Sequence, residues 1–292
     1  MIAYNKTDSL DRIYADAKAA CQAGTIYNLM LSYEFDLGVV DSQFVKLHEA
    51  KAKDWQSEQP PNLFFSHGQF FKGDKGVRHV IQELKTKSAS RRALLSLISM
   101  EHVLGSGDRA IPSFMIVQFG LADKTLYVTA YFRALEVANF LPINLTEIAI
   151  LISRITREIS AKTVRLLVIA FQAYQTPEFH CLEKAQLDLQ KRGAVGAAVV
   201  KRDVENLVSW LEGKKQHESE IVTDGLEEMV NVVDEYPALY TPAFASALHS
   251  ALRSLERMKE LRASSSEGAT IDQQHAKYLK QLQEAINALR GE

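Results

Sequence analysis

The sequence predicts an α+β fold followed by a C-terminal α-helical extension. Over residues 1–213, runs rich in aromatic and β-branched residues alternate with segments whose apolar residues recur at helical spacing. Beyond the charged run KKQHESE at 214–220, the remaining segments all have helical character. We therefore expect one α+β domain over residues 1–217 and a helical extension over residues 218–292.

Composition narrows the functional classes. The 292 residues, 47% of them hydrophobic, are enough for one large domain plus an appendage. A formal net charge of -2 gives no electrostatic reason to expect nucleic acid as a partner. Two cysteines make neither a disulfide framework nor a zinc site, and the apolar runs are too short for a signal peptide or a membrane span. We expect a cytoplasmic protein with no bound metal and no membrane partner.

The N-terminal elements are defined by their end signals. A helix is expected over 8–23, because Asp8 or Ser9 can cap its start and a glycine follows its end. The aromatic and β-branched run at 25–37 predicts a strand. The stretch at 39–62 reads as irregular.

The rest of the first 213 residues continues the alternation. The tripeptide ADK between two β-rich runs predicts a hairpin, and Thr146 is the expected cap of the helix that follows. The expected elements are a helix at 75–87, a short strand at 91–99, β-rich runs at 113–121 and 125–134, a helix at 146–160, a strand at 164–174, a helix at 176–192, a strand at 194–203 and a closing segment at 204–213.

The C-terminal extension carries two apolar stripes at helical spacing. They lie in 238–263 and 271–292, separated by the linker-like SSSEGAT at 264–270. Such stripes pack within the chain or against a partner helix, so these helices are a candidate surface for a protein partner.

Three segments between residues 76 and 144 occur in a distinctive order: GVRHVIQELKTKSASRRALLSL, IPSFMIVQF and LYVTAYFRALEVANFLPINL. In order and spacing they resemble the central part of the thymidylate synthase family. That family has a helix leading to a paired-arginine strand, a Pro-Cys-His loop before a Gln-Phe strand, and an Arg-Ser-x-Asp segment running to Pro-Phe-Asn. Weaker similarity extends over about residues 8–213. The resemblance implies a mixed sheet with flanking helices, one face of which forms a homodimer interface.

The resemblance also implies a set of substrate-binding residues. Arg133 corresponds to the family's phosphate ligand, and Arg91 and Arg92 correspond to arginines that reach across from the dimer partner. Arginine suits a phosphate because its guanidinium is a permanently charged fork of donors. Asn144 corresponds to the residue that reads the pyrimidine edge with its amide. Glu136 stands at the aspartate of the Arg-Ser-x-Asp segment and belongs to the same set.

The sequence around Arg133 indicates a negatively charged partner even without the family resemblance. Arg133 follows the apolar run LYVTAYF, so its backbone is expected at the end of a buried strand. An unpaired guanidinium is unfavourable there, and it therefore needs either an anionic ligand or a carboxylate. Glu136 is the alternative internal partner.

Several positions depart from the family pattern. Ser113 replaces the nucleophilic cysteine, Phe114 the following histidine, Ala134 the serine of Arg-Ser-x-Asp, and Phe140 a glycine whose place lies next to ligand. A hydroxyl is a much weaker nucleophile than a thiolate unless a base activates it. The family's catalytic glutamate and its histidine–tyrosine sugar contact have no counterpart. Ser113 therefore reads either as a replaced nucleophile or as a small polar residue at a loop–strand junction.

These observations leave three hypotheses. The first is a degenerate thymidylate synthase homologue that binds a pyrimidine nucleotide or a similar phosphate ligand without methyl transfer, needs no cofactor, and serves sensing or assembly. The second is an active folate-dependent pyrimidine methyl- or hydroxymethyltransferase with a rearranged site, which needs methylenetetrahydrofolate. The third is a structural dimer with a vestigial pocket.

Overall fold

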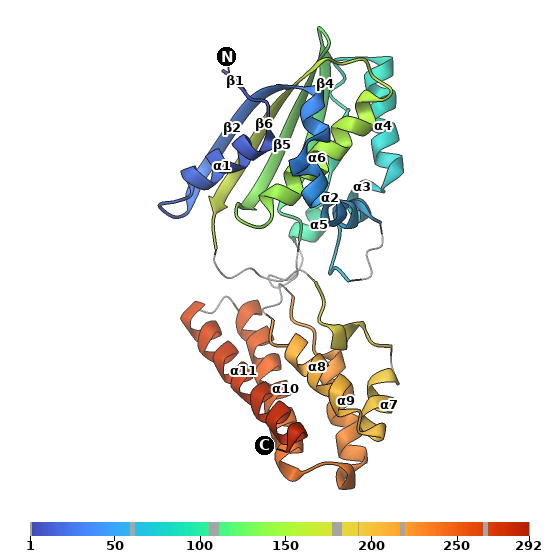
Figure 1. Ribbon diagram of the computed structural model, residues 1–292, viewed down its shortest axis with the longest axis vertical. Helices are drawn as coiled ribbons and strands as arrows, with labels where there is room; N and C mark the ends of the chain where they lie inside the picture. Colours follow the sequence, from blue (N-terminus) through green and yellow to red (C-terminus); the bar gives the residue numbers. More distant parts are fainter. Residues whose placement is uncertain are drawn as a thin grey trace. The chain divides into compact units, whose positions relative to one another are not determined.

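The computed structural model describes residues 2–58, 62–104, 111–176, 183–191, 193–216, 220–264 and 268–291. The chain forms two compact units (Figure 1). The sheet unit comprises Met1–Pro60, Phe65–Leu104 and Ile111–Phe179, and the helical unit comprises Pro61–Phe64, Gly105–Ala110 and His180–Glu292. The boundary expected after residue 217 lies outside the described residues and stays a prediction; the helical unit of the structure takes in the chain from His180 onward.

A six-stranded mixed sheet organises the sheet unit, in the order β1-β2-β6-β5-β4-β3. The β1/β2 and β5/β6 pairs are parallel, and the β2/β6, β3/β4 and β4/β5 pairs are antiparallel. This confirms the predicted α+β class with a mixed sheet. The strands are β1 (Asn5–Lys6), β2 (Ile26–Asp36), β3 (Leu94–Ser96), β4 (Phe114–Ala122), β5 (Thr125–Glu136) and β6 (Thr163–Tyr174).

The predicted hairpin joins β4 to β5. Asp123 and Lys124 both have positive φ, 49° and 62°, as a two-residue type I′ turn requires. The antiparallel register that this turn starts brings Phe114, at the beginning of β4, opposite Phe132 near the end of β5. The turn thus aligns the two chain segments that hold most of the predicted site.

Helices α1, α2, α4 and α6 lie on one face of the sheet (Figure 1). Alternate residues of β5, from Leu126 to Phe132, are buried against them, as expected for a strand with one covered face. The helices of this unit are α1 (Leu10–Ala20), the 3₁₀ turn η1 (Leu37–Asp41), α2 (Gln43–Gln56), α3 (His67–Phe71), α4 (Asp74–Thr86), α5 (Met100–Val103) and α6 (Leu141–Thr156).

The opposite face of the sheet carries a row of apolar side chains. Met30, Ile169, Tyr131 and Ile116 are consecutive cross-strand partners on β2, β6, β5 and β4, so they project from the same face. Met30 is 55% exposed and Ile116 36%. Beside this row, Phe171 is 51% exposed and contacts Tyr27 edge-on. We call these residues the open-face patch.

Two helical segments of the sheet unit differ from expectation. Residues 39–62 were expected to be irregular, but α2 occupies most of them because Phe44, Val45, Ala52 and Trp55 pack inward at helical spacing. The helix expected from Thr146 begins five residues earlier, at Leu141, with Pro142 in its first turn. Thr146 is an interior residue that donates its hydroxyl proton to the Pro142 carbonyl. By contrast, Ser9 caps α1 as predicted.

The helical unit has its own core, separate from that of the sheet unit. The strand expected at 194–203 is the helix α7, whose buried Val195, Ala198 and Val199 fit helical spacing equally well. Part of the helix expected at 176–192 lies outside the described residues, and the rest forms only a short 3₁₀ turn. The elements are η2 (Gln186–Leu189), α7 (Ala194–Lys201), α8 (Val204–Gly213), α9 (Asp224–Glu235), η3 (Pro237–Leu239), α10 (Pro242–Ala263) and α11 (Gly268–Arg290).

A buried ion pair joins η2 to the residue that follows α8. The Lys214 ammonium lies 2.8 Å from a carboxylate oxygen of Asp188, and both side chains are at most 1% exposed. Lys214 also donates to the Val222 carbonyl, and Tyr278 donates its hydroxyl proton to the Lys214 carbonyl. Burial raises the pKa of Asp188, and Lys214 opposes that shift.

Candidate functional site

The candidate site lies where β4 begins and β5 ends. Ser113 directly precedes β4, and its carbonyl accepts the backbone N–H of Arg133 at 2.9 Å. The hairpin therefore places the two residues side by side although they are twenty positions apart in the sequence. Beneath them, the rings of Phe114 and Phe132 stack with centroids 4.6 Å apart.

Arg133 lacks a carboxylate partner among the described residues. Its guanidinium donates to two backbone carbonyls of the loop before Ser113, those of Pro112 at 3.1 Å and Ile111 at 3.0 Å. Burial lowers the pKa of the guanidinium from its ordinary value, while Tyr174 opposes that shift. Because an arginine has five N–H donors, the two carbonyls leave donor capacity for an anion.

Glu136 is not the internal partner that the sequence offered for Arg133. Its carboxylate is 8% exposed and accepts the backbone N–H groups of Ala138, Asn139 and Phe140 at 3.0, 2.7 and 3.1 Å. These are donors of the turn that leads into α6, where a negative charge is favourable. The carboxylate of Glu136 thus accepts hydrogen bonds from the backbone, and these stabilise its charge without Arg133.

Tyr174 is a site residue that sequence reasoning missed. It ends β6 directly beside Glu136 in the parallel register. Burial raises the pKa of its hydroxyl, Glu136 adds to this shift and Arg133 opposes it. A half-buried phenol influenced by both a cation and a carboxylate can donate a hydrogen bond to a bound ligand.

Asn144 belongs to a closed polar cluster. Its amide donates to a carboxylate oxygen of Glu147 at 3.1 Å, and both side chains are buried. The same carboxylate lies 2.8 and 3.0 Å from the Nδ1 of His67, which is also buried. The side chains of His67, Asn144 and Glu147 are thus joined by hydrogen bonds beneath the site. One amide N–H of Asn144 is therefore already used within the protein.

Aromatic rings enclose this cluster. Trp55 lies 4.8 Å from the His67 ring and 5.7 Å from Phe140, and His67 meets Phe114 edge-on at 5.5 Å. The sequence indicated that Phe140 replaces a glycine whose place lies next to ligand. The structure places this ring against Trp55.

Ser113 stands apart from any base. Its side chain is half-buried, and among the described residues no histidine or carboxylate hydrogen-bonds to its hydroxyl. The nearby imidazole of His67 is held by Glu147. A serine without such a partner keeps its ordinary low nucleophilicity.

Arg91 and Arg92 lie elsewhere in the same chain. Both are exposed, and their carbonyls accept from Gln118 and His79, at 3.1 Å each. Gln118 is five residues along β4 from Ser113, which corresponds to about 16 Å. A single protomer therefore does not bring this pair to Arg133. No ion pair involving either residue occurs within the described part of the chain.

The described residues contain no group of three or more metal-binding side chains, and none of the described helices combines the length and apolar character needed to cross a bilayer. Comparison of the chain with protein-family models and with curated proteins finds no match. The candidate site is therefore defined by its geometry: an arginine without a carboxylate partner beside a serine, above a closed polar cluster.

Proposed function

We propose that the protein is a thymidylate synthase-like homodimer that binds a pyrimidine nucleoside monophosphate, or a similar phosphate-bearing ligand, without Cys-dependent methyl transfer. Its role in the cytoplasm is sensing or assembly. The observation that carries the proposal is Arg133, an exposed arginine whose guanidinium has spare donors and no carboxylate partner in the described structure. A phosphate dianion supplies the missing negative charge in bidentate form.

The open-face patch supports the homodimer. Met30 and Ile116 are exposed and Tyr131 and Ile169 are partly exposed, and an apolar row of this kind across four strands is typical of a protein interface. The resemblance to thymidylate synthases implies that pairing two protomers through this face also brings the partner's arginine pair to the site. Arg91 and Arg92 are exposed and without described ion pairs, as such a role requires.

Isothermal titration calorimetry with dUMP, dCMP and dTMP tests the binding. We expect saturable binding of at least one nucleotide, lost in Arg133→Ala and retained in Arg157→Ala, which removes an exposed arginine at the end of α6. A flat response to all three nucleotides contradicts the proposal.

A heterodimer sharpens the test. Arg133→Ala and Arg91→Ala/Arg92→Ala each remove a different half of the proposed phosphate site. If the halves come from different subunits, a heterodimer of the two variants regains one intact site, although neither homodimer binds. Failure of the heterodimer to recover binding contradicts the intersubunit site.

The purely structural dimer is the second candidate, and the closed cluster favours it. The amide of Asn144 donates to Glu147, so a pyrimidine edge must compete with an internal carboxylate. This candidate predicts no nucleotide binding but a dimer in analytical ultracentrifugation. Phe171→Glu should dissociate that dimer, whereas Leu47→Glu, on α2 and 73% exposed, should not.

The active-enzyme alternative has a direct test in Ser113→Cys. The variant restores the thiol, and tritium release from C5-labelled dUMP with methylenetetrahydrofolate then reports attack on the ring. We predict no release, because the sequence has no counterpart of the family's glutamate. Release would support a transferase.

A further inference from the structure

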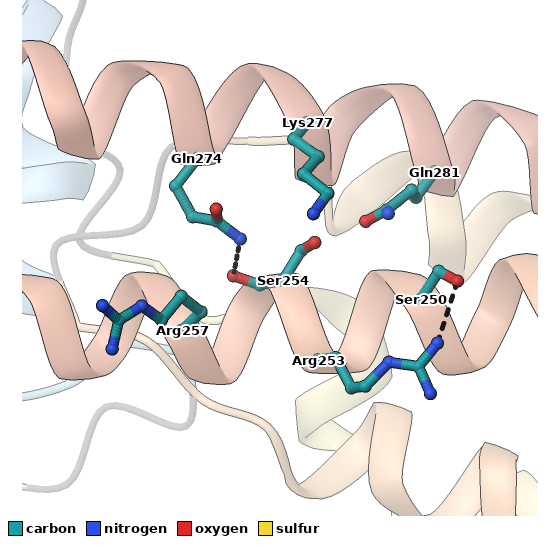
Figure 2. A pocket seen from close by; sticks show the side chains of 7 residues that line it. All are labelled: Ser250, Arg253, Ser254, Arg257, Gln274, Lys277 and Gln281. Atoms are coloured by element: carbon teal, nitrogen blue, oxygen red, sulfur yellow. Dashed lines mark hydrogen bonds between the residues drawn. The ribbon is translucent and has the colours of Figure 1, made fainter.

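A basic groove lies between α10 and α11 in the helical unit, far in the sequence from Ser113 and Arg133. It has a volume of about 300 Å³ and is lined by Ser250, Arg253, Ser254, Arg257, Gln274, Lys277 and Gln281 (Figure 2). Three of these residues are cationic and none is acidic. We propose that this groove binds the phosphate group of a small phosphorylated molecule.

The cations of the groove are largely without internal counter-ions. Arg253 donates to the Ser250 hydroxyl at 3.2 Å and has no carboxylate partner among the described residues. Lys277 likewise makes no ion pair within that part of the chain. Arg257 contacts Glu260 at 2.7 Å, but both side chains are more than half exposed, so water weakens this pair.

The floor of the groove is polar and buried. Ser254 is 3% exposed, and its hydroxyl points between Lys277 and Gln281 (Figure 2). The Oε1 atom of Gln281 is buried without a hydrogen-bond partner, although it lines the groove. A buried unsatisfied amide is unfavourable, and rotation of the amide by half a turn presents its N–H₂ to an anion instead.

The surrounding surface favours a small ligand over an extended polyanion. Lys259 and Lys280 lie on the same two helices outside the groove, and their positive charges alternate with the negative charges of Glu256, Glu260 and Glu284. A nucleic acid needs a basic surface that continues along its backbone. The positive potential here is local, and the volume is at the lower end of the range for small-molecule sites.

Calorimetric titration with inorganic phosphate and with glycerol 2-phosphate tests the proposal, at a constant ionic strength of about 0.15 M. The full-length Arg133→Ala variant is the starting protein, so that phosphate bound at the sheet-unit site does not contribute. We expect saturable binding in this background. Its presence or absence is independent of the function proposed above.

Matched charge removals locate the binding. Arg253→Gln with Lys277→Gln should weaken binding about tenfold or more, because charge-assisted hydrogen bonds are lost. Lys259→Gln with Lys280→Gln removes the same charge from the same two helices outside the groove and should leave affinity unchanged. Equal losses in the two double variants, or no saturable binding at all, would overturn the proposal.

Gln281→Glu gives a second test that keeps all three cations. It places a carboxylate on the floor of the groove, so we expect phosphate binding to weaken while the helices stay folded by circular dichroism. Unchanged phosphate affinity in this variant would also count against the groove.

Discussion

Two regions near the end of β5 differ in whether their charged side chains have partners within the protein. At Glu136, and nearby at Glu147, the carboxylates are buried and accept hydrogen bonds from backbone N–H groups or from His67 and Asn144. Three residues before Glu136, the guanidinium of Arg133 donates to two backbone carbonyls and, in the part of the chain that the structure describes, to no carboxylate. The difference separates charges that organise the fold from a charge that is left for a ligand.

The helical unit repeats this contrast. Lys214 and Asp188 are buried and paired, whereas Arg253 and Lys277 face a groove without a carboxylate. If the distinction is correct, removing a paired charge lowers stability, and removing an unpaired cation affects binding while the fold persists. The predictions below test this, from the largest expected effect on stability to the smallest.

Lys214→Met should be the most destabilising change. It leaves the carboxylate of Asp188 buried without its cation, and breaking a buried pair in this way costs about 3–5 kcal/mol. Urea unfolding followed by circular dichroism measures the loss. Lys280→Met, which removes an exposed lysine of α11, should change stability little. A loss at Lys214 no larger than at Lys280 would show that the pair contributes nothing.

Glu147→Ala tests the closed cluster of the sheet unit. The change leaves donors of His67 and Asn144 buried without an acceptor, so we expect a loss of about 3 kcal/mol in the free energy of unfolding. Glu158→Ala, which breaks only an exposed pair with Lys85, is the control and should cost under about 1 kcal/mol. Similar losses in both variants would contradict the scaffold role of the cluster.

Glu136→Gln separates folding from binding at the end of β5. It removes the charge that accepts the backbone N–H groups of Ala138, Asn139, Phe140 and Thr176, and we expect a stability loss of about 1–2 kcal/mol. Nucleotide affinity, measured by calorimetry, should not fall, because the carboxylate serves the backbone rather than the ligand. A strong loss of affinity with little change in stability would restore Glu136 to the binding site.

Tyr33→Phe gives a smaller, pH-dependent effect. The Tyr33 hydroxyl donates to Asp16 at 2.5 Å; this bond lowers the pKa of Asp16, and burial raises that of Tyr33. The lowered pKa of Asp16 stabilises the fold at pH values above 3.8, the ordinary pKa of the carboxyl group. The raised pKa of Tyr33 stabilises it at pH values below 10.0, the ordinary pKa of the phenol.

Between these two pH values the variant should therefore be less stable than the wild type by about 1 kcal/mol. The expected difference is small because solvent around Asp16 weakens the interaction. The difference should shrink as the pH falls below that window or rises above it. Thermal melts across the pH range measure it. A difference that stays constant with pH would mean that the hydrogen bond is not its source.

Local patterns in the sequence predicted the part of the fold that holds Ser113 and Arg133. Alternating side chains and a short turn were enough to predict the hairpin of β4 and β5. The helix α2 was missed because its inward-facing residues, Phe44 to Trp55, lie in an otherwise polar stretch. The helix α7 was taken for a strand because a short apolar run fits both periodicities.

The polar cluster could not be predicted in this way. His67 and Glu147 are separated by eighty positions, and their contact depends on how α3 and α6 pack. The role of Glu136 is likewise tertiary in part, because its acceptor geometry depends on the turn after β5. The sequence identified which residues are charged, and only the fold shows which of those charges are already paired.

The most direct test of this distinction is calorimetric titration of dUMP into the wild type and Arg133→Ala, with the melting temperature of each measured in parallel. We predict saturable binding to the wild type and loss of the Arg133-dependent heat in the variant, which keeps a similar melting temperature. Equal binding by both proteins, or no binding to the wild type, would contradict the claim that the unpaired arginine is held for a phosphate.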